Sequence, residues 1–235
     1  MINLTENFRK IQDLLAGAEQ AAGRPPGSVR LLAVSKTKPA KAILEAARAG
    51  QREFGENFVQ EALGKMDELG DAELTWHFIG HLQSNKTRAV AERFDWVHTV
   101  DRYKIARRLS EQRSPHAPPL NVCLQVNVDD ETTKSGLAPD AVRDLARRVA
   151  ELPRLKLRGL MCIPQPRDDT EGQRLPFARL RELKEQLEEH GLELDTLSMG
   201  MTADYAAAIA EGATIVRIGT ALFGPRETEH EGDQS

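Results

Sequence analysis

A lysine and an arginine at opposite ends of the chain carry the first chemical signal. Lys36 ends the apolar run of LLAVSKTKP, and Arg217 lies inside the apolar run of VRIGTALFG. An unpaired buried charge is costly, so an arginine in a buried strand needs a partner. A lysine at a strand end holds a phosphate as a point charge or forms an imine with a carbonyl group. Taken alone, Lys36 also fits an ordinary solvated loop lysine.

The elements that must position these residues alternate along the chain. We expect an amphipathic helix at 3–22, then strands at 30–35, 52–55, 75–79, 96–99, 120–126, 155–161, 194–198 and 214–218, with helices between them. Eight such units favour a single (β/α)₈ TIM barrel, an α/β fold, with an extra N-terminal helix. A doubly wound open sheet is the alternative, but the first turn, SKTKPA, lacks the glycine-rich phosphate loop typical of that fold.

Composition places the chain in a broad class. The 235 residues show no composition shift, which predicts one domain over 1–228 and a disordered polar tail over 229–235. A net charge of −4 weighs against nucleic acid or membrane partners. The absence of an apolar leader or spanning segment favours a cytoplasmic protein. Cys123 and Cys162 lie in or beside apolar runs, as buried thiols in a reducing compartment do.

A closed barrel would bring the lysine and the arginine together. Strand eight pairs with strand one in such a barrel, and the side chains of each strand alternate between its two faces. Lys36 shares a face with Val34, and Arg217 shares a face with Gly219. If both faces point inward, Lys36 and Arg217 meet at the C-terminal mouth, where barrel active sites lie.

Two turns at the same mouth have the composition of a phosphate site. The turn after strand seven, LSMGMTAD, offers Ser198, Gly200 and Thr202, and the turn after strand eight offers Gly219 and Thr220. The loops after strands seven and eight form a recurrent phosphate site in these barrels, and helix N-termini add free N–H donors. An amine, a guanidinium and a phosphate cradle at one mouth predict an aldehyde that bears a phosphate.

Eight stretches of the chain carry a family resemblance that runs nearly end to end: LLAVSKTKP, FGENFVQEAL, WHFIGHLQSNK, HTVDR, LQVNVDDETTKSGL, LRGLMCIP, LSMGMTADYAAAI and VRIGTALFG. In these the chain resembles the pyridoxal 5′-phosphate (PLP) homeostasis proteins, the YggS/PROSC group. The resemblance implies that Lys36 holds PLP as a Schiff base and that Arg217 faces the pyridine nitrogen. It also implies that the 198–202 turn, with Gly219 and Thr220, holds the phosphate. Members more often have serine where this chain has Thr202, which keeps the hydroxyl.

The arginine bears on the kind of chemistry. Arginine does not readily give up a proton, so a ring nitrogen that faces it makes the cofactor a weak electron sink. The chain is also similar to the barrel domain of alanine racemases, which add a β-domain with a tyrosine as second base. This chain ends at 235, and neither of its tyrosines, Tyr103 and Tyr205, falls in a turn that would aim it at the ligand.

These features predict a PLP-binding protein of intracellular PLP homeostasis that buffers or delivers the cofactor without efficient catalysis. No catalytic residue is assigned, and PLP-requiring apoenzymes are the expected recipients. A monomer is favoured. A PLP-dependent amino-acid racemase of weak activity is one alternative, and a cofactor-free Schiff-base aldolase or phosphate-binding barrel is another.

Three more residues near the mouth are candidates for contact with the cofactor. Asn57 follows strand two, where it either reaches the cofactor or caps the next helix. Met199 and Met201 flank Gly200, where packing is the usual role of methionine.

Four residues have plainer interpretations. His77 and His81 are four apart, and we expect hydrogen bonds at the mouth rather than a metal site, since no third ligand is near. Lys38 is expected to face the same way as Lys36. Lys134 is interpreted as a loop charge, with the alternative that it accepts the cofactor during transfer.

Overall fold

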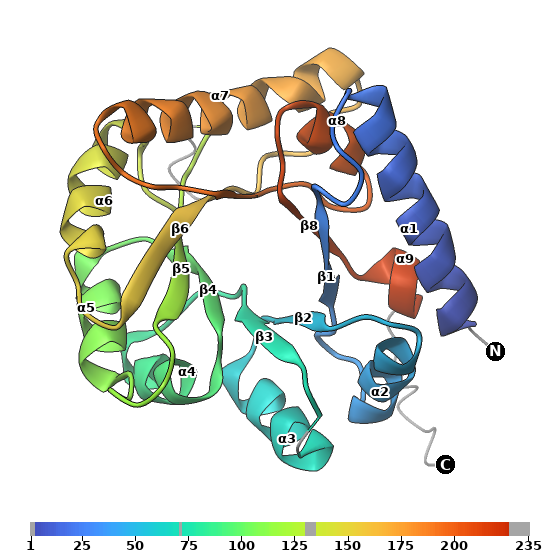
Figure 1. Ribbon diagram of the computed structural model, residues 1–235, viewed down its shortest axis with the longest axis horizontal. Coiled ribbons are helices and arrows are strands. Elements are labelled where there is room, and N and C mark those ends of the chain that lie inside the picture. Colours follow the sequence, from blue (N-terminus) through green and yellow to red (C-terminus); the bar gives the residue numbers. More distant parts are fainter. Residues whose placement is uncertain (1–2, 71, 130–134, 226–235) are drawn as a thin grey trace, which may run out of the picture.

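The computed structural model describes residues 3–70, 72–129 and 135–225. Eight parallel strands close into a barrel in sequence order, each hydrogen-bonded to the next and β8 to β1 (Figure 1). The strands are β1 (Arg30–Val34), β2 (Glu53–Glu56), β3 (Thr75–Phe78), β4 (Trp96–Val100), β5 (Leu120–Gln125), β6 (Leu155–Met161), β7 (Thr196–Ser198) and β8 (Ile215–Ile218). The predicted (β/α)₈ barrel is confirmed.

Helices surround the sheet and include the expected extra one at the start (Figure 1). They are α1 (Leu4–Ala21), α2 (Ala40–Arg48), α3 (Val59–Leu69), α4 (Thr87–Arg93), α5 (Tyr103–Gln112), α6 (Val142–Ala150), α7 (Thr170–Glu189), α8 (Tyr205–Ala210) and α9 (Thr220–Phe223). The Asn3 side chain accepts from the backbone N–H of Glu6 and so caps α1. Helix α1 packs on α8 and α9, and the Asn7 side chain donates to the Leu222 carbonyl at 3.0 Å. The extra helix thereby supports the turn that follows β8.

Element boundaries differ from the prediction mainly around β7. The strand begins at Thr196, two residues later than expected, and α8 follows only at Tyr205. Between them Gly200 has φ +93°, and the N–H of Met201 donates to Asp204 Oδ1 at 2.6 Å. The N–H of Asp204 donates back to the Met201 carbonyl at 3.2 Å, so residues 201–204 form a hydrogen-bonded turn before α8 begins. The short α9 was not predicted.

The apolar core has three parts. The largest lies between the sheet and the helices, and a small cluster of Leu32, Ile79 and Ile215, with Val34 against it, lies inside the barrel. The faces of β1 and β8 that point into the barrel are therefore those predicted from the sequence. A third cluster consists of Trp96, Cys123 and Met161. Cys123 and Cys162 are buried free thiols, as expected, and burial raises the pKa of each to about 12.

Membrane insertion has no support in the helices. Over the ranges that the structure describes, no helix has both the length and the apolar character needed to cross a bilayer.

Candidate functional site

A pocket of about 270 Å³ opens at the C-terminal ends of the strands. Its lining comprises Val34, Lys36, Asn57, Ile79, Ile163, Met201, Thr202, Arg217, Gly219 and Thr220. Seven of these were predicted from the sequence as site residues. Ser198, Met199 and Gly200, also predicted, are not in the lining. The lysine and the arginine from opposite ends of the chain thus line the same pocket.

Arg217 is only 4% exposed and is held from below by backbone and side-chain oxygens. Its Nη1 donates to the Ser198 carbonyl at 2.7 Å and to Ser198 Oγ at 2.9 Å, and its Nη2 donates to the Cys162 carbonyl at 2.8 Å. Of the five N–H groups of a guanidinium, Nε–H and one Nη2–H are left for the pocket. Burial lowers the pKa of Arg217, but no ion pair with a carboxylate is found for it in the described part of the chain.

The turn after β7 differs in detail from its predicted role. Ser198 Oγ lies 2.7 Å from His98 Nδ1 and accepts from Arg217, so the hydroxyl supports the arginine instead of lining a phosphate site. Met199 is fully buried in the core between sheet and helices, which removes it from the ligand side. Gly200 contributes its carbonyl to the N–H of Arg217 at 3.0 Å. A Cβ on Gly200 would lie 2.6 Å from the Ala208 side chain, so the turn needs glycine for space as well as for its φ.

A buried ion pair holds the base of the Lys36 turn. Glu56, at the end of β2, is fully buried, and its Oε1 accepts from Ser35 Oγ at 2.7 Å and from Lys65 Nζ at 2.6 Å. Lys65 also donates to the Ser35 carbonyl at 2.8 Å. Burial raises the pKa of Glu56, while its contacts with Lys65 act in the opposite direction. The backbone immediately before Lys36 is therefore fixed by β2 and α3.

The next two residues of this turn are also anchored. Thr37 has φ +64°, unusual for a β-branched residue, and its N–H donates to Glu61. Lys38 Nζ donates to the Pro225 carbonyl at 2.6 Å and is absent from the pocket lining. The expectation that Lys38 faces the same way as Lys36 is wrong, because the C-terminal segment offers its ammonium a carbonyl outside the pocket.

Asn57 has an unsatisfied polar atom at the pocket. Helix α3 begins at Val59 with Phe58 at its N-cap position, and no side chain caps it, so Asn57 does not serve as a helix cap. Its Oδ1 is buried and finds no hydrogen-bond partner among the residues described. Buried polar atoms are usually paired, so this oxygen is suited to a donor on a ligand. A wider hollow of about 510 Å³ next to the pocket shares Asn57, but neither Lys36 nor Arg217 lines it.

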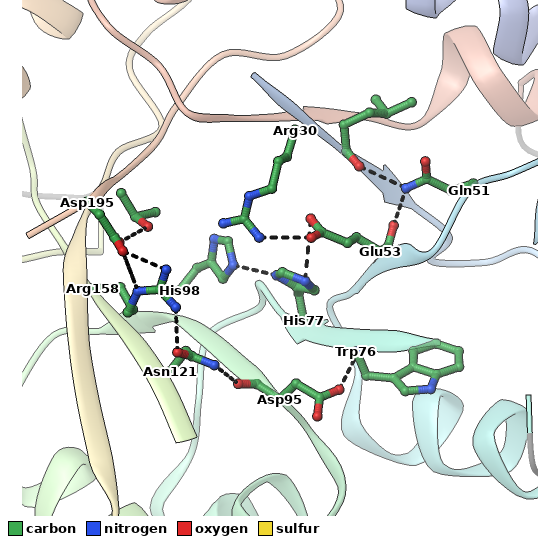
Figure 2. A network of polar contacts seen from close by, with 12 residues as sticks. Arg30, Gln51, Glu53, Trp76, His77, Asp95, His98, Asn121, Arg158 and Asp195 are labelled. Carbon is green, nitrogen blue, oxygen red and sulfur yellow. Dashed lines mark hydrogen bonds and ion pairs between the residues drawn. The ribbon is translucent and has the colours of Figure 1, made fainter. Parts of the chain in front are cut away.

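His77 and His81 lie in different environments. His81 is exposed on the loop after β3, whereas His77 is fully buried and its Nδ1 lies 2.9 Å from His98 Nε2 (Figure 2). The prediction that His77 lies at the mouth is wrong, since its side chain occupies the barrel interior below the pocket. Burial lowers the pKa of His77 well below the usual value and that of His98 to about 3.

Charged residues surround Trp96 around the start of the barrel strands. The guanidinium groups of Arg30 and Arg158 lie 5.1 and 4.7 Å from the centre of its ring. Arg30 pairs with Glu53 at 2.8 Å, and Arg158 pairs with Asp195 at 2.7 Å (Figure 2). These contacts fill the end of the barrel opposite the pocket with paired charges.

Several residues that line or support the pocket were not predicted from the sequence. Ile79 and Ile163 line the pocket, and Glu56 and His98 support it from behind. The alternation along β3 places Ile79 on the face of His77 and could have identified it. No local pattern marks His98 or Glu56, because their partners come from other strands.

Two further sequence expectations concern residues away from the pocket. Lys134 lies outside the described residues. Tyr103 packs beneath Arg148, 4.0 Å from the guanidinium carbon to the ring centre, and neither it nor Tyr205 lines the pocket.

Comparison with known proteins gives this geometry a family. Residues 3–227 match the model of the alanine racemase N-terminal domain. The pyridoxal phosphate homeostasis protein of Pseudomonas aeruginosa is 61% identical over 227 residues, 97% of each chain. The chain belongs to the pyridoxal phosphate homeostasis protein family. The Escherichia coli K12 member is 51% identical, over 97% of this chain and 98% of its own.

Solved structures agree with this family membership. PipY of Synechococcus elongatus PCC7942, solved with PLP bound, is 41% identical, with a TM-score of 0.80 over 94% of this chain and all of its own. Alanine racemase of Corynebacterium glutamicum is 18% identical, with a TM-score of 0.73 over 97% of this chain and 64% of its own, a likeness in fold. The homeostasis family therefore shares its barrel with alanine racemases.

Proposed function

We propose that this protein binds PLP in the pocket of Lys36 and Arg217 and serves intracellular PLP homeostasis. The observation that carries the proposal is the fixed guanidinium of Arg217, with two unused N–H groups in a pocket that also holds a lysine amine. The bound PLP named for PipY and the names of the relatives support it.

The residues present fit each part of the cofactor. The Lys36 amine suits the aldehyde, with which it condenses with release of one water, and the Arg217 N–H groups suit an unprotonated ring nitrogen. Thr202, Thr220 and the backbone at Gly219 suit the phosphate. Val34, Ile79 and Ile163 suit the flat ring, and the unpartnered Asn57 Oδ1 suits a hydroxyl donor.

The same geometry favours storage over turnover. PLP when bound supplies an electron sink whose strength depends on a protonated ring nitrogen. Arg217 retains its protons and cannot readily protonate that nitrogen. Neither tyrosine of the chain lines the pocket, so neither stands where a second base would be needed. We propose that the protein is a cytoplasmic monomer that buffers PLP and passes it to apoenzymes.

The decisive experiment traps the cofactor on its lysine. Purified protein with added PLP is reduced with borohydride, digested and mapped by mass spectrometry. We expect the adduct on Lys36 and its loss in Lys36→Ala. Lys38→Ala is the matched control, since Lys38 binds the Pro225 carbonyl outside the pocket, and it should keep the adduct. An adduct elsewhere, or no PLP uptake, contradicts the proposal, and racemisation of L-alanine at rates typical of enzymes would favour the racemase alternative.

A further inference from the structure

Beneath the pocket a row of polar side chains crosses the barrel interior. Arg217 Nη1 lies 2.9 Å from Ser198 Oγ, Ser198 Oγ lies 2.7 Å from His98 Nδ1, and His98 Nε2 lies 2.9 Å from His77 Nδ1. His77 Nε2 then faces Glu53 Oε2 at 3.9 Å (Figure 2). The row joins β8, β7, β4, β3 and β2, so it links the pocket to the charged end of the barrel.

The arginine end sets the direction of this row. A guanidinium only donates, so Ser198 Oγ accepts from Arg217. The buried Ser198 hydroxyl has one other side-chain partner in the described part of the chain, His98 Nδ1, and a hydroxyl without an acceptor is costly there. Ser198 therefore donates to His98 Nδ1. A neutral imidazole that accepts at Nδ1 carries its proton on Nε2, from which His98 donates to His77 Nδ1.

The carboxylate end gives the same direction independently. Glu53 Oε1 is paired with Arg30, while Glu53 Oε2 and His77 Nε2 are both buried without a hydrogen-bond partner among the residues described. At 3.9 Å they are too far apart for a direct hydrogen bond, but they face each other. A carboxylate oxygen only accepts hydrogen bonds. A proton on His77 Nε2 would therefore face Glu53 Oε2 favourably, whereas an unprotonated Nε2 would set its lone pair against those of the carboxylate.

Both imidazoles are neutral in this setting. Each is fully buried, and among the described residues no carboxylate lies within hydrogen-bond distance of either ring. The charged groups that face them are Arg217 from β8, Arg30 from β1 and Glu53 from β2. Burial is the main cause that lowers the pKa of each histidine. His98 and Arg30 lower that of His77 further, and Arg217 and Arg30 lower that of His98 further, which agrees with the neutral forms.

We infer that Ser198, His98 and His77 are positioning residues that form a one-way hydrogen-bond chain from Arg217 toward Glu53, with both imidazoles protonated at Nε2. The chain fixes the guanidinium so that its remaining N–H groups serve the ligand. The existence of the chain is independent of the proposed function, whereas its effect on PLP binding rests on it.

The first test reads the tautomers directly. Full-length protein labelled with ¹⁵N-histidine is studied by long-range ¹H–¹⁵N correlation between pH 5 and 8, a window that spans the usual histidine pKa. We expect His77 and His98 to stay neutral across this range, with the proton on Nε2 of each ring. The signals of His77 and His98 are assigned in two independent ways, from the signals lost in His77→Gln and from the NOE between the two imidazole rings. A proton on Nδ1 of either buried ring, or a charged ring, overturns the chain.

The second test asks whether the chain positions Arg217. We expect Ser198→Ala to shift the His98 nitrogens and to weaken PLP binding roughly tenfold, the loss expected for one hydrogen bond to a charged group. Ser110→Ala is the matched control, because Ser110 is a buried serine of α5 bonded to the Pro153 carbonyl away from the pocket, and it should change neither. Unaltered PLP affinity in Ser198→Ala overturns the positioning role. Failure of the unmodified protein to bind PLP would instead refute the proposed function, while the tautomer result still decides the chain.

Discussion

Acid should destabilise this protein through its two buried histidines. His98 has a pKa of about 3 in the folded protein, against about 6.5 in an unfolded chain. Because the folded pKa is the lower one, the unfolded chain takes up the proton first. The stability is therefore complete above pH 6.5 and is lost as the pH falls toward 3.

The size of the effect follows from the shift. Each histidine that protonates only in the unfolded chain costs about 1.4 kcal/mol per pH unit, so His98 alone removes about 2.5 kcal/mol between pH 7.5 and 4.5. Burial also lowers the pKa of His77 well below its usual value, so His77 adds to this loss. Burial raises the pKa of Glu56 and of Asp204, which opposes the trend at the acid end.

Urea unfolding at pH 7.5, 6.5, 5.5 and 4.5 measures this slope. His98→Gln cannot titrate, so its stability should fall less steeply than that of the unmodified protein, by about 1.4 kcal/mol per pH unit below pH 6. His116→Gln, at an exposed position, is the matched control and should keep the original slope. Equal slopes for His98→Gln and the unmodified protein would refute a neutral buried His98.

Two further predictions concern the supports of the pocket. Gly200→Ala would place a Cβ 2.6 Å from the Ala208 side chain, at a φ of +93° that alanine rarely adopts, so we expect at least tenfold weaker PLP binding. Gly17→Ala is the control, because Gly17 has open space around it, and it should leave PLP binding unchanged. Spectrophotometric titration with PLP measures both affinities. Lys65→Met leaves the buried Glu56 carboxylate unpaired and should cost about 3–5 kcal/mol in urea unfolding at pH 7.5. Glu56→Gln with Lys65→Met should recover part of that loss, and no recovery would contradict the ion-pair interpretation.

The meeting of Lys36 and Arg217 was predictable because it depends on two regular features. Barrel closure makes β8 a neighbour of β1, and period-two alternation fixes the inward faces, as the register of Leu32 opposite Arg217 shows. The same alternation places Ser198 inside the barrel and Met199, like Leu197, in the outer core, so it argues against the predicted ligand contact of Met199. The regular pattern ends at Gly200, which adopts φ +93°.

The support of the pocket was not predictable, since it consists of contacts between distant strands. The pair of Ser198 and His98 spans 100 residues, and the buried contact of Lys65 with Ser35 spans 30. A lone histidine in an apolar run looks like an ordinary core residue, and only the fold reveals which atoms face it. Long-range polar pairing therefore has to be read from the structure.

The direction of the interior chain bears on why the site would retain PLP without using it. Every link from Arg217 to His77 donates away from the pocket, so the barrel interior accepts hydrogen bonds from the guanidinium and offers it no proton in return. To protonate a ring nitrogen, Arg217 would have to lose a proton, and the chain could replace it only by reversing both imidazoles and the Ser198 hydroxyl. Two buried neutral histidines with low pKa values oppose the charged state that such a reversal would pass through. The features that fix the guanidinium thereby also weaken the electron sink, which favours binding and release over turnover.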